Sequence, residues 1–153
     1  MRPFAIPGSI SAINKKKNEL LDKIPEIAGN FSKLSSETPL ISIVIPAYND
    51  EENILKTLYS ISLPNSKHGI EVIVVNNNSA DETESLALAC NVRCIKETKQ
   101  GITNARNGGL AHAKGTYLIN ADADTIYPPS WIDDMINPLL KNEGICLTYG
   151  KFS

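Results

Sequence analysis

The sequence predicts an α/β domain in which a mostly parallel sheet is flanked by helices. From residue 40 onward, strand-like and helix-like segments alternate, which is typical of parallel strands joined by helical crossovers. The segments at 41–45 and 72–75 are nearly continuous runs of β-branched residues, as expected for strands that are buried on both faces. A length of 153 residues with 42% hydrophobic residues is enough for one domain with its own core.

Residues 1–39 are expected to form an amphipathic helical segment and a polar linker, ahead of the domain proper at 40–153. Apolar side chains recur at nearly helical spacing between residues 12 and 34, and Pro25 should break or restart this helix. A lysine run at 15–17 lies beside the apolar face. Residues 12–34 could therefore make peripheral contact with an anionic membrane surface. Packing against the domain is the plainer alternative.

The first two strands each lead into a helix that has its own start signal. After the strand at 41–45, Asp50 is placed to cap a helix with apolar residues on one side. After the strand at 72–75, residues 79–82 have the spacing of a capping box and should start the second helix. Each unit is therefore interpreted as a strand followed by a crossover helix.

The second half of the domain continues the alternation up to a fifth strand, after which the chain ends. A helix is expected from about Thr103 to Lys114, and Gly115 can end it in a left-handed conformation. Pro128 and Pro129 can open the last helix. The remaining strands are expected at residues 92–95, 117–121 and 145–149.

Two acidic residues, Asp122 and Asp124, follow the apolar run at 117–119. Side chains alternate along an extended segment, so both carboxylates should point to the same side. Such a pair of oxygen donors suits Mg²⁺ or Mn²⁺, which commonly bridges a protein to the phosphates of its substrate. Asp is also an ordinary turn residue at the end of a strand, so the motif depends on its surroundings.

Polar clusters follow three of the predicted strands, at residues 46–49, 76–79 and 120–124. The carboxyl ends of parallel strands meet at one edge, where open α/β sheets bind their ligands. The sequence contains neither the Gly-x-Gly-x-x-Gly pattern of dinucleotide sites nor a P-loop. Phosphate should therefore be held through a metal on Asp124, and the first two clusters remain available for a base and a ribose.

Composition excludes several classes of function. The net charge of −2 gives no reason to expect a nucleic-acid partner. The three cysteines lack the spacing of a disulfide framework or a zinc site and are interpreted as buried thiols. The sequence has no apolar run of membrane-spanning length and no signal-peptide core at its start. A cytoplasmic location is expected, and peripheral contact with the inner face of the membrane is the alternative.

Four motifs, taken in order, resemble the glycosyltransferase family 2 group. They are Ile43-Val44-Ile45-Pro46-Ala47-Tyr48-Asn49, Val74-Val75-Asn76-Asn77-Asn78-Ser79-Ala80-Asp81, Ala105-Arg106-Asn107 with Gly109, and Asp122-Ala123-Asp124. The resemblance covers roughly residues 40–150. It implies the GT-A fold, a UDP- or GDP-linked sugar donor, a divalent cation (Mg²⁺ or Mn²⁺), inversion at the anomeric carbon, and a role in polysaccharide or glycoconjugate synthesis.

The resemblance also implies roles for individual residues. Tyr48 corresponds to a ring that stacks on the base, Asp122 to an acid that contacts the ribose, and Asp124 to the metal ligand. Asn76 stands where family members often have an Asp that bonds the base edge, which is a departure from the pattern. The nucleotide-sugar-binding residues implied in this way are Pro46, Ala47, Tyr48, Asn49, Glu51, Asn76, Asn78, Arg106, Asp122 and Ala123.

Three of these positions have a structural alternative. Tyr48 could be a half-buried loop aromatic. Asn78, with Asn77, could serve the turn instead. Arg106 is equally suited to approach the nucleotide or to pin a neighbouring loop carboxylate.

No general base can be assigned. In the family that residue lies beyond the equivalent of the strand at 145–149, so the chain resembles the donor-binding half of a glycosyltransferase. On its own it is expected not to transfer sugar, because a base must deprotonate the acceptor hydroxyl. The alternative is a non-catalytic module that binds a nucleotide sugar or a partner. A sugar nucleotidylyltransferase is a weaker alternative, since its Gly-rich loop after the first strand is missing.

Overall fold

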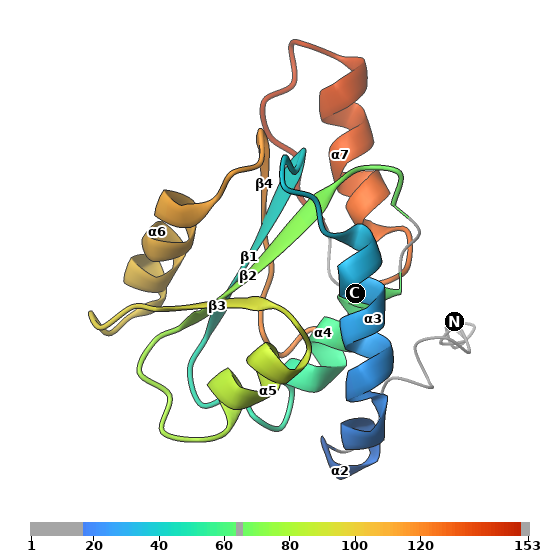
Figure 1. Cartoon of the computed structure of the whole chain (residues 1–153). Helices are drawn as coiled ribbons and strands as arrows, with labels where there is room; N and C mark the ends of the chain where they lie inside the picture. The colour runs from blue at the N-terminus through green and yellow to red at the C-terminus, as the bar shows by residue number, and fades with distance from the viewer. Residues whose placement is uncertain (1–16, 64–65, 151–153) are drawn as a thin grey trace, which may run out of the picture.

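The structure is a computed structural model that describes residues 17–63 and 66–150. At its centre lies a parallel sheet of four strands in the order β3-β2-β1-β4 (Figure 1). The strands are β1 (Ile41–Ala47), β2 (Ile70–Asn76), β3 (Arg93–Lys96) and β4 (Tyr117–Asn120). The predicted α/β class and the parallel arrangement are confirmed.

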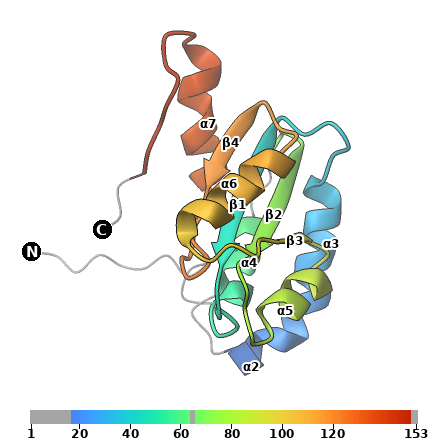
Figure 2. The same cartoon turned by 90° about the vertical axis from the view of Figure 1, so that its left-hand side faces the viewer.

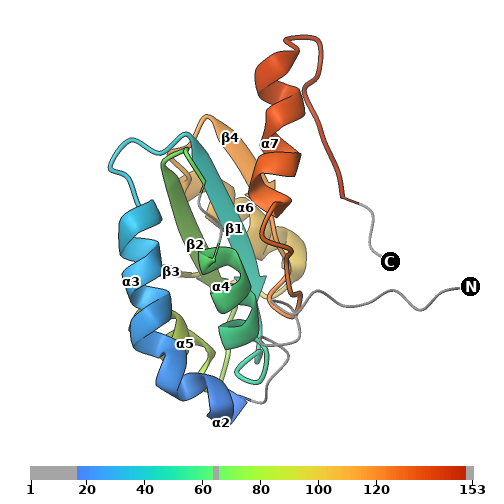
Figure 3. The same ribbon diagram turned by 90° about the vertical axis from the view of Figure 1, so that its right-hand side faces the viewer.

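Helices cover both faces of this sheet. They are α2 (Lys17–Leu20), the 3₁₀ turn η1 (Leu21–Lys23), α3 (Ile24–Leu34), α4 (Ile54–Ser62), α5 (Thr83–Ala89), α6 (Ile102–His112) and α7 (Trp131–Lys141). One face carries α3, α4, α5 and α7, and α6 lies on the opposite face (Figures 2 and 3).

The core has two parts because β1 and β2 are buried on both sides. Ile41, Ile43 and Ile45 of β1 pack in the larger part, with the apolar side of α4. Val44 points the other way and packs in a smaller cluster with Ala105 of α6. All seven residues of β1 are buried, which confirms the interpretation of the continuous apolar runs.

The N-terminal helical segment belongs to the larger part of the core. Pro25 occupies the first turn of α3, so the helix restarts there as predicted. Leu20, Ile27 and Phe31 are at most 5% exposed and pack with the strands. The apolar face of this segment is therefore buried against the domain. No helix within residues 17–63 and 66–150 has both the length and the apolar character needed to cross a membrane.

The predicted strand at 145–149 is wrong, because these residues form no strand in the structure. A strand needs a partner for its backbone groups, and β4, the edge strand nearest in sequence, pairs only with β1. The segment is instead held to α7, where the Thr148 hydroxyl donates to the Met135 carbonyl at 2.8 Å. Leu147 and Tyr149 remain exposed.

Three predicted helix signals act differently in the structure. Residues 79–82 form no capping box, because α5 begins at Thr83 without a side-chain cap and Ser79 Oγ accepts from the Asn49 amide instead. The Asp50 carboxylate accepts a hydrogen bond from the Tyr48 amide at 3.0 Å and does not cap α4. It is the Asp50 carbonyl that receives the first amides of that helix. The backbone of Gly115 does not adopt the left-handed conformation. A side chain there would lie 2.5 Å from the Ser42 backbone nitrogen, so close approach to β1 is what requires a glycine.

The three cysteines differ in exposure, so the prediction that all are buried is wrong for Cys146, which is exposed, and for Cys94, which is half-buried. Burial raises the pKa of Cys90 to about 12 and that of Cys94 to about 11. A thiol-disulfide reagent at pH 8 should therefore label Cys146 first, because thiolate attack needs access as well as deprotonation. Rapid labelling of Cys90 in the folded protein, followed by mass spectrometry, would contradict this packing.

Candidate functional site

The three polar clusters lie where the neighbouring strands β2, β1 and β4 end. Ala47 is paired with Asn76, the last residue of β2, and Asn120 ends β4 in register with Val44. The loops that leave these strands therefore emerge from one edge of the sheet. Residues 121–124 continue the alternation of β4: Ala121 and Ala123 are buried and the two acids between and after them are exposed.

A cleft of about 250 Å³ opens at this edge beside the end of β1. It is lined by Pro46, Ala47, Tyr48, Asp50, Asn77, Gln100, Gly101, Ile102 and Ala105. Sequence reasoning assigned the first three of these residues to the site. It did not assign the others to the site: Asp50 and Asn77 come from the loops after β1 and β2, Gln100 and Gly101 from the loop before α6, and Ile102 and Ala105 from α6 itself. Asn77 and Ala105 lie within the recognised motifs, whereas Gln100, Gly101 and Ile102 carry no recognisable signal in the sequence. The Tyr48 side chain is 53% exposed, so its ring is available for stacking.

The loops after β1 and β2 are joined by hydrogen bonds. The Asn49 amide donates to Ser79 Oγ at 3.0 Å, and the Ala80 amide donates to Asn49 Oδ1 at 2.8 Å. The Asp50 amide donates to Thr83 Oγ1 at 2.8 Å. Asn49 has a positive φ of 53°, which asparagine tolerates better than most residues. Its side chain therefore shapes the loop and does not line the cleft.

Asn76 is absent from the lining of the cleft, and both polar atoms of its side chain are hydrogen-bonded within the chain. It is 2% exposed. Its Nδ2 donates to Glu84 Oε2 at 2.6 Å, and its Oδ1 accepts from the Ser79 amide at 2.8 Å. These bonds give Asn76 a role in shaping the β2–α5 loop, and the base-edge role that the resemblance implies stays a prediction.

Asn77 and Asn78 instead hold the loop before α6. Asn77 Nδ2 donates to the carbonyls of Glu97 and Lys99 at 2.8 and 2.9 Å, and its Oδ1 accepts from the Gly101 amide at 2.7 Å. Asn78 bonds to the same loop and adopts a positive φ of 66°. Both side chains therefore stabilise the turn and the loop that it contacts, as the structural alternative predicts. Asn77 also lines the cleft.

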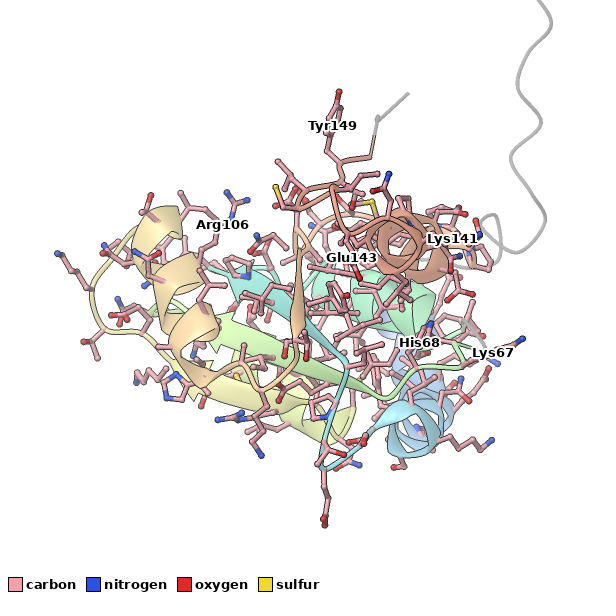
Figure 4. All side chains as sticks on the ribbon, turned by 90° about the horizontal axis from the view of Figure 1, so that it is seen from above. Lys67, His68, Arg106, Lys141, Glu143 and Tyr149 are labelled. Atoms are coloured by element: carbon pink, nitrogen blue, oxygen red, sulfur yellow. The ribbon has the colours of Figure 1, made fainter. Side chains whose placement is uncertain are left out.

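Arg106 and Asp122 form an ion pair between α6 and the loop after β4. Arg106 Nη2 lies 3.2 Å from Asp122 Oδ1, with both side chains about half exposed. Arg106 Nε is buried and has no hydrogen-bond partner. Figure 4 shows this side chain projecting from α6. Arg106 thus pins a loop carboxylate, as one alternative proposed, while donors of the guanidinium stay available to a ligand.

A second cleft, of about 600 Å³, lies between β4, α7 and residues 145–150. Arg106 and Asp122 line it together with apolar side chains such as Leu118 and Trp131. Ala105 lines the smaller cleft and its neighbour Arg106 lines the larger one. The two clefts are therefore adjacent along α6.

Asp124 is exposed, and its carboxylate has one weak contact, from Thr125 Oγ1 at 3.4 Å. Its loop is anchored to α4, where the single proton of the Thr57 hydroxyl is shared between the Ala123 carbonyl, 2.7 Å from Oγ1, and the Thr125 carbonyl, 2.9 Å from it. Ala123 itself is 5% exposed and contributes no side chain to the surface. The backbone on either side of Asp124 is therefore held in place, and the carboxylate itself is exposed to solvent.

Negative charge accumulates around Asp124. Burial raises the pKa of Asp50 above its ordinary value, against a hydrogen bond from the Tyr48 amide, and the charges of Asp124 and Asp81 raise it further. Within residues 17–63 and 66–150, no three His, Cys, Asp or Glu side chains come together as a metal site. The exposed carboxylate of Asp124 suits Mg²⁺ or Mn²⁺, because these ions are commonly bound by one or two carboxylates plus substrate phosphates.

Glu51 lies beside the site and outside the lining of both clefts. Its Oε2 accepts from the Glu82 amide at 3.0 Å and lies 3.1 Å from Lys17 Nζ. The implied contact of Glu51 with a nucleotide sugar would therefore compete with these internal contacts.

Comparison with known proteins places this geometry in a family. The sequence model described as "Glycosyl transferase family 2" matches residues 42–152. An uncharacterized glycosyltransferase of Rickettsia bellii is 36% identical over 78% of this chain and 18% of that protein. Glycosyltransferase AglE of Haloferax volcanii is 33% identical over 77% of this chain and 41% of its own.

Solved structures agree with these relatives. The glucosyl-3-phosphoglycerate synthase of Mycobacterium tuberculosis, crystallised with Mn²⁺, UDP-glucose and phosphoglyceric acid, superposes with a TM-score of 0.59. It is 27% identical over 80% of this chain and 45% of its own. The present chain thus spans less than half the length of each of these three proteins. The family match over most of its residues and the four-stranded GT-A sheet show that the chain belongs to glycosyl transferase family 2.

Proposed function

We propose that this chain is the donor-binding part of an inverting glycosyltransferase that uses a nucleotide-diphosphate sugar and a divalent cation. The observation that carries the proposal is the shared edge of the sheet, where the Tyr48 cleft and the exposed carboxylate of Asp124 both lie. The similarity to an enzyme crystallised with Mn²⁺ and UDP-glucose supports it. Transfer of the sugar to an acceptor is proposed for the whole protein and belongs to the same proposal.

In this proposal, each of the two clefts binds a different part of the donor. Tyr48 and the backbone around Gly101 hold the base in the smaller cleft, and Asp122 receives the ribose beside Arg106. The sugar then points into the larger cleft. When bound at Asp124, Mg²⁺ or Mn²⁺ supplies charge that stabilises the departing diphosphate. The chain's own part is to orient the donor, because correct placement lowers the barrier before any bond is broken.

Calorimetry tests the proposal directly. UDP and GDP are titrated into the chain with Mn²⁺ and with a chelator. We expect one of the two nucleotides to bind with Mn²⁺ present and to bind at least about tenfold more weakly with the chelator. No binding of either nucleotide at millimolar concentration with Mn²⁺ present would contradict the proposal.

The variant Tyr48→Ala should bind the preferred nucleotide about tenfold more weakly, because stacking on one base contributes roughly 1–3 kcal/mol in nucleic-acid sites. Its melting temperature should stay nearly constant, since the ring is 53% exposed. Leu88→Ala is the matched control, because this apolar side chain of α5 is 55% exposed and lines neither cleft. A large drop in melting temperature with unchanged affinity would instead give Tyr48 a packing role.

A further inference from the structure

The N-terminal helical segment precedes the family match, which starts at residue 42, yet it contacts the loops of the candidate site. Lys17, at the start of α2, carries this contact. Its Nζ lies 3.1 Å from Glu51 Oε2 and 2.7 Å from Glu82 Oε2. Figure 3 shows α2 at the same end of the molecule as the loop that leaves β1. One lysine therefore binds the loops that follow both β1 and β2.

The two acids are themselves linked. The Glu51 oxygen that pairs with Lys17 also accepts the Glu82 amide at 3.0 Å, and the Glu51 amide donates to Asp81 Oδ2 at 3.1 Å. The hydrogen bond from the Glu82 amide, together with that from Lys17, lowers the pKa of Glu51. Glu51 is therefore ionised at neutral pH, and Lys17 offsets the repulsion between two adjacent carboxylates.

Lys17 is held in place by the packing of its own segment. Its side chain is 12% exposed. Leu20, one turn further along, is fully buried, and so is Ile27 of α3. Because the core already fixes the helix, little additional freedom is lost when the lysine pairs with the loop acids.

We propose that Lys17 is a positioning residue for the donor site, through which the N-terminal helical segment holds the loops at 48–53 and 77–83 in their binding geometry. The inference rests on the nucleotide binding proposed above. Lys17 does not touch the donor. It acts by keeping Glu51 and Glu82 together, and with them the loops that carry Tyr48 and Asn77.

The first test measures nucleotide affinity by calorimetry with Mn²⁺ and the nucleotide that the parent prefers. Lys17→Met should weaken binding about three- to tenfold; a modest effect is expected because partly exposed ion pairs contribute little. Lys17→Arg should keep most of the affinity. Lys23→Met is the matched control, since Lys23 lies in the same segment and pairs with Glu26, at 2.7 Å, within that segment. Parent-like affinity of Lys17→Met would overturn the inference.

A charge exchange separates positioning from general destabilisation. Lys17→Glu should weaken binding more than Lys17→Met does, and adding Glu82→Lys should restore affinity to within about threefold of the parent. A merely structural contribution of α2 would not be restored by moving the charge. Absence of rescue in a variant that melts like the parent would also overturn the inference.

Amide hydrogen exchange, measured without nucleotide, tests whether Lys17 holds the two loops independently of the proposed nucleotide binding. The amides of Asn49, Asp50 and Glu51 donate across the two loops. Their protection should fall in Lys17→Met and stay unchanged in Lys23→Met. If the parent binds no nucleotide, the proposed function fails, and unchanged protection in Lys17→Met would show separately that Lys17 does not hold the loops.

Discussion

The variant Gly109→Ala should lose about 1–3 kcal/mol of folding free energy, and more if the helix cannot shift, because it overpacks a filled core. A methyl group at this position would lie 2.2 Å from Val44 Cγ1 and 3.1 Å from Val75 Cγ2. Gly109 therefore allows α6 to pack closely on the sheet. Since Arg106 lies one turn earlier on α6, the same variant should also displace the Arg106–Asp122 pair.

Gly108→Ala is the matched control for this substitution. The three atoms nearest to a methyl group there all belong to the side chain of Glu97: Oε2 at 3.1 Å, which can rotate away, and Cβ and Cγ at 3.7 and 3.8 Å, which are ordinary contacts. Alanine has the higher helix propensity, so this variant should be neutral or gain up to about 1 kcal/mol. Urea denaturation of both variants gives the comparison. Equal stability of Gly108→Ala and Gly109→Ala would contradict the close packing of α6.

The variant Asp124→Asn should lose the metal-dependent part of nucleotide affinity. Changes to outer-shell partners of a metal ligand already cost about 10–100-fold in metal affinity, so loss of a ligand itself should cost at least as much. In calorimetry, binding with Mn²⁺ should fall to the level measured with the chelator. The melting temperature should stay close to that of the parent, because the carboxylate is exposed and its hydrogen bond from Thr125, at 3.4 Å, is long.

Asp22→Asn controls for the loss of one negative charge, since Asp22 is exposed on η1 and distant in sequence from the site. It should bind nucleotide and Mn²⁺ like the parent. Unchanged metal dependence in Asp124→Asn would move the metal role to another residue.

The sheet and its binding edge could be predicted because their signals are local. The β-branched runs of β1 and β2 indicate buried strands, and parallel pairing then brings the polar residues that follow the strands to one edge. The exposure of Asp122 and Asp124 follows from the alternation that Tyr117–Asn120 begins.

The features that could not be predicted depend on distant contacts. Asn76 and Asn77 are adjacent and chemically identical, and their contacts distinguish them: Asn76 bonds to Glu84 and Ser79, whereas Asn77 bonds to the loop at 97–101. The run at 145–149 has a strand-like pattern and no partner strand. Lys17 belongs to a run of lysines that suggested a charged surface, and its acids lie more than 30 residues away in the chain.

The central claim is that nucleotide and metal bind together at the carboxyl edge of the sheet. Two-dimensional ¹H–¹⁵N NMR of the chain, titrated with Mg²⁺ and UDP or GDP, tests it residue by residue. We predict the largest shifts at the amides of Tyr48, Asn77 and Gly101 and at residues 122–125, with the latter group requiring Mg²⁺. A separate cavity of about 550 Å³ lies at the amino ends of β2 and β3, lined by residues such as Arg93 and Lys114. Shifts centred on that cavity, with none at the carboxyl edge, would contradict the account.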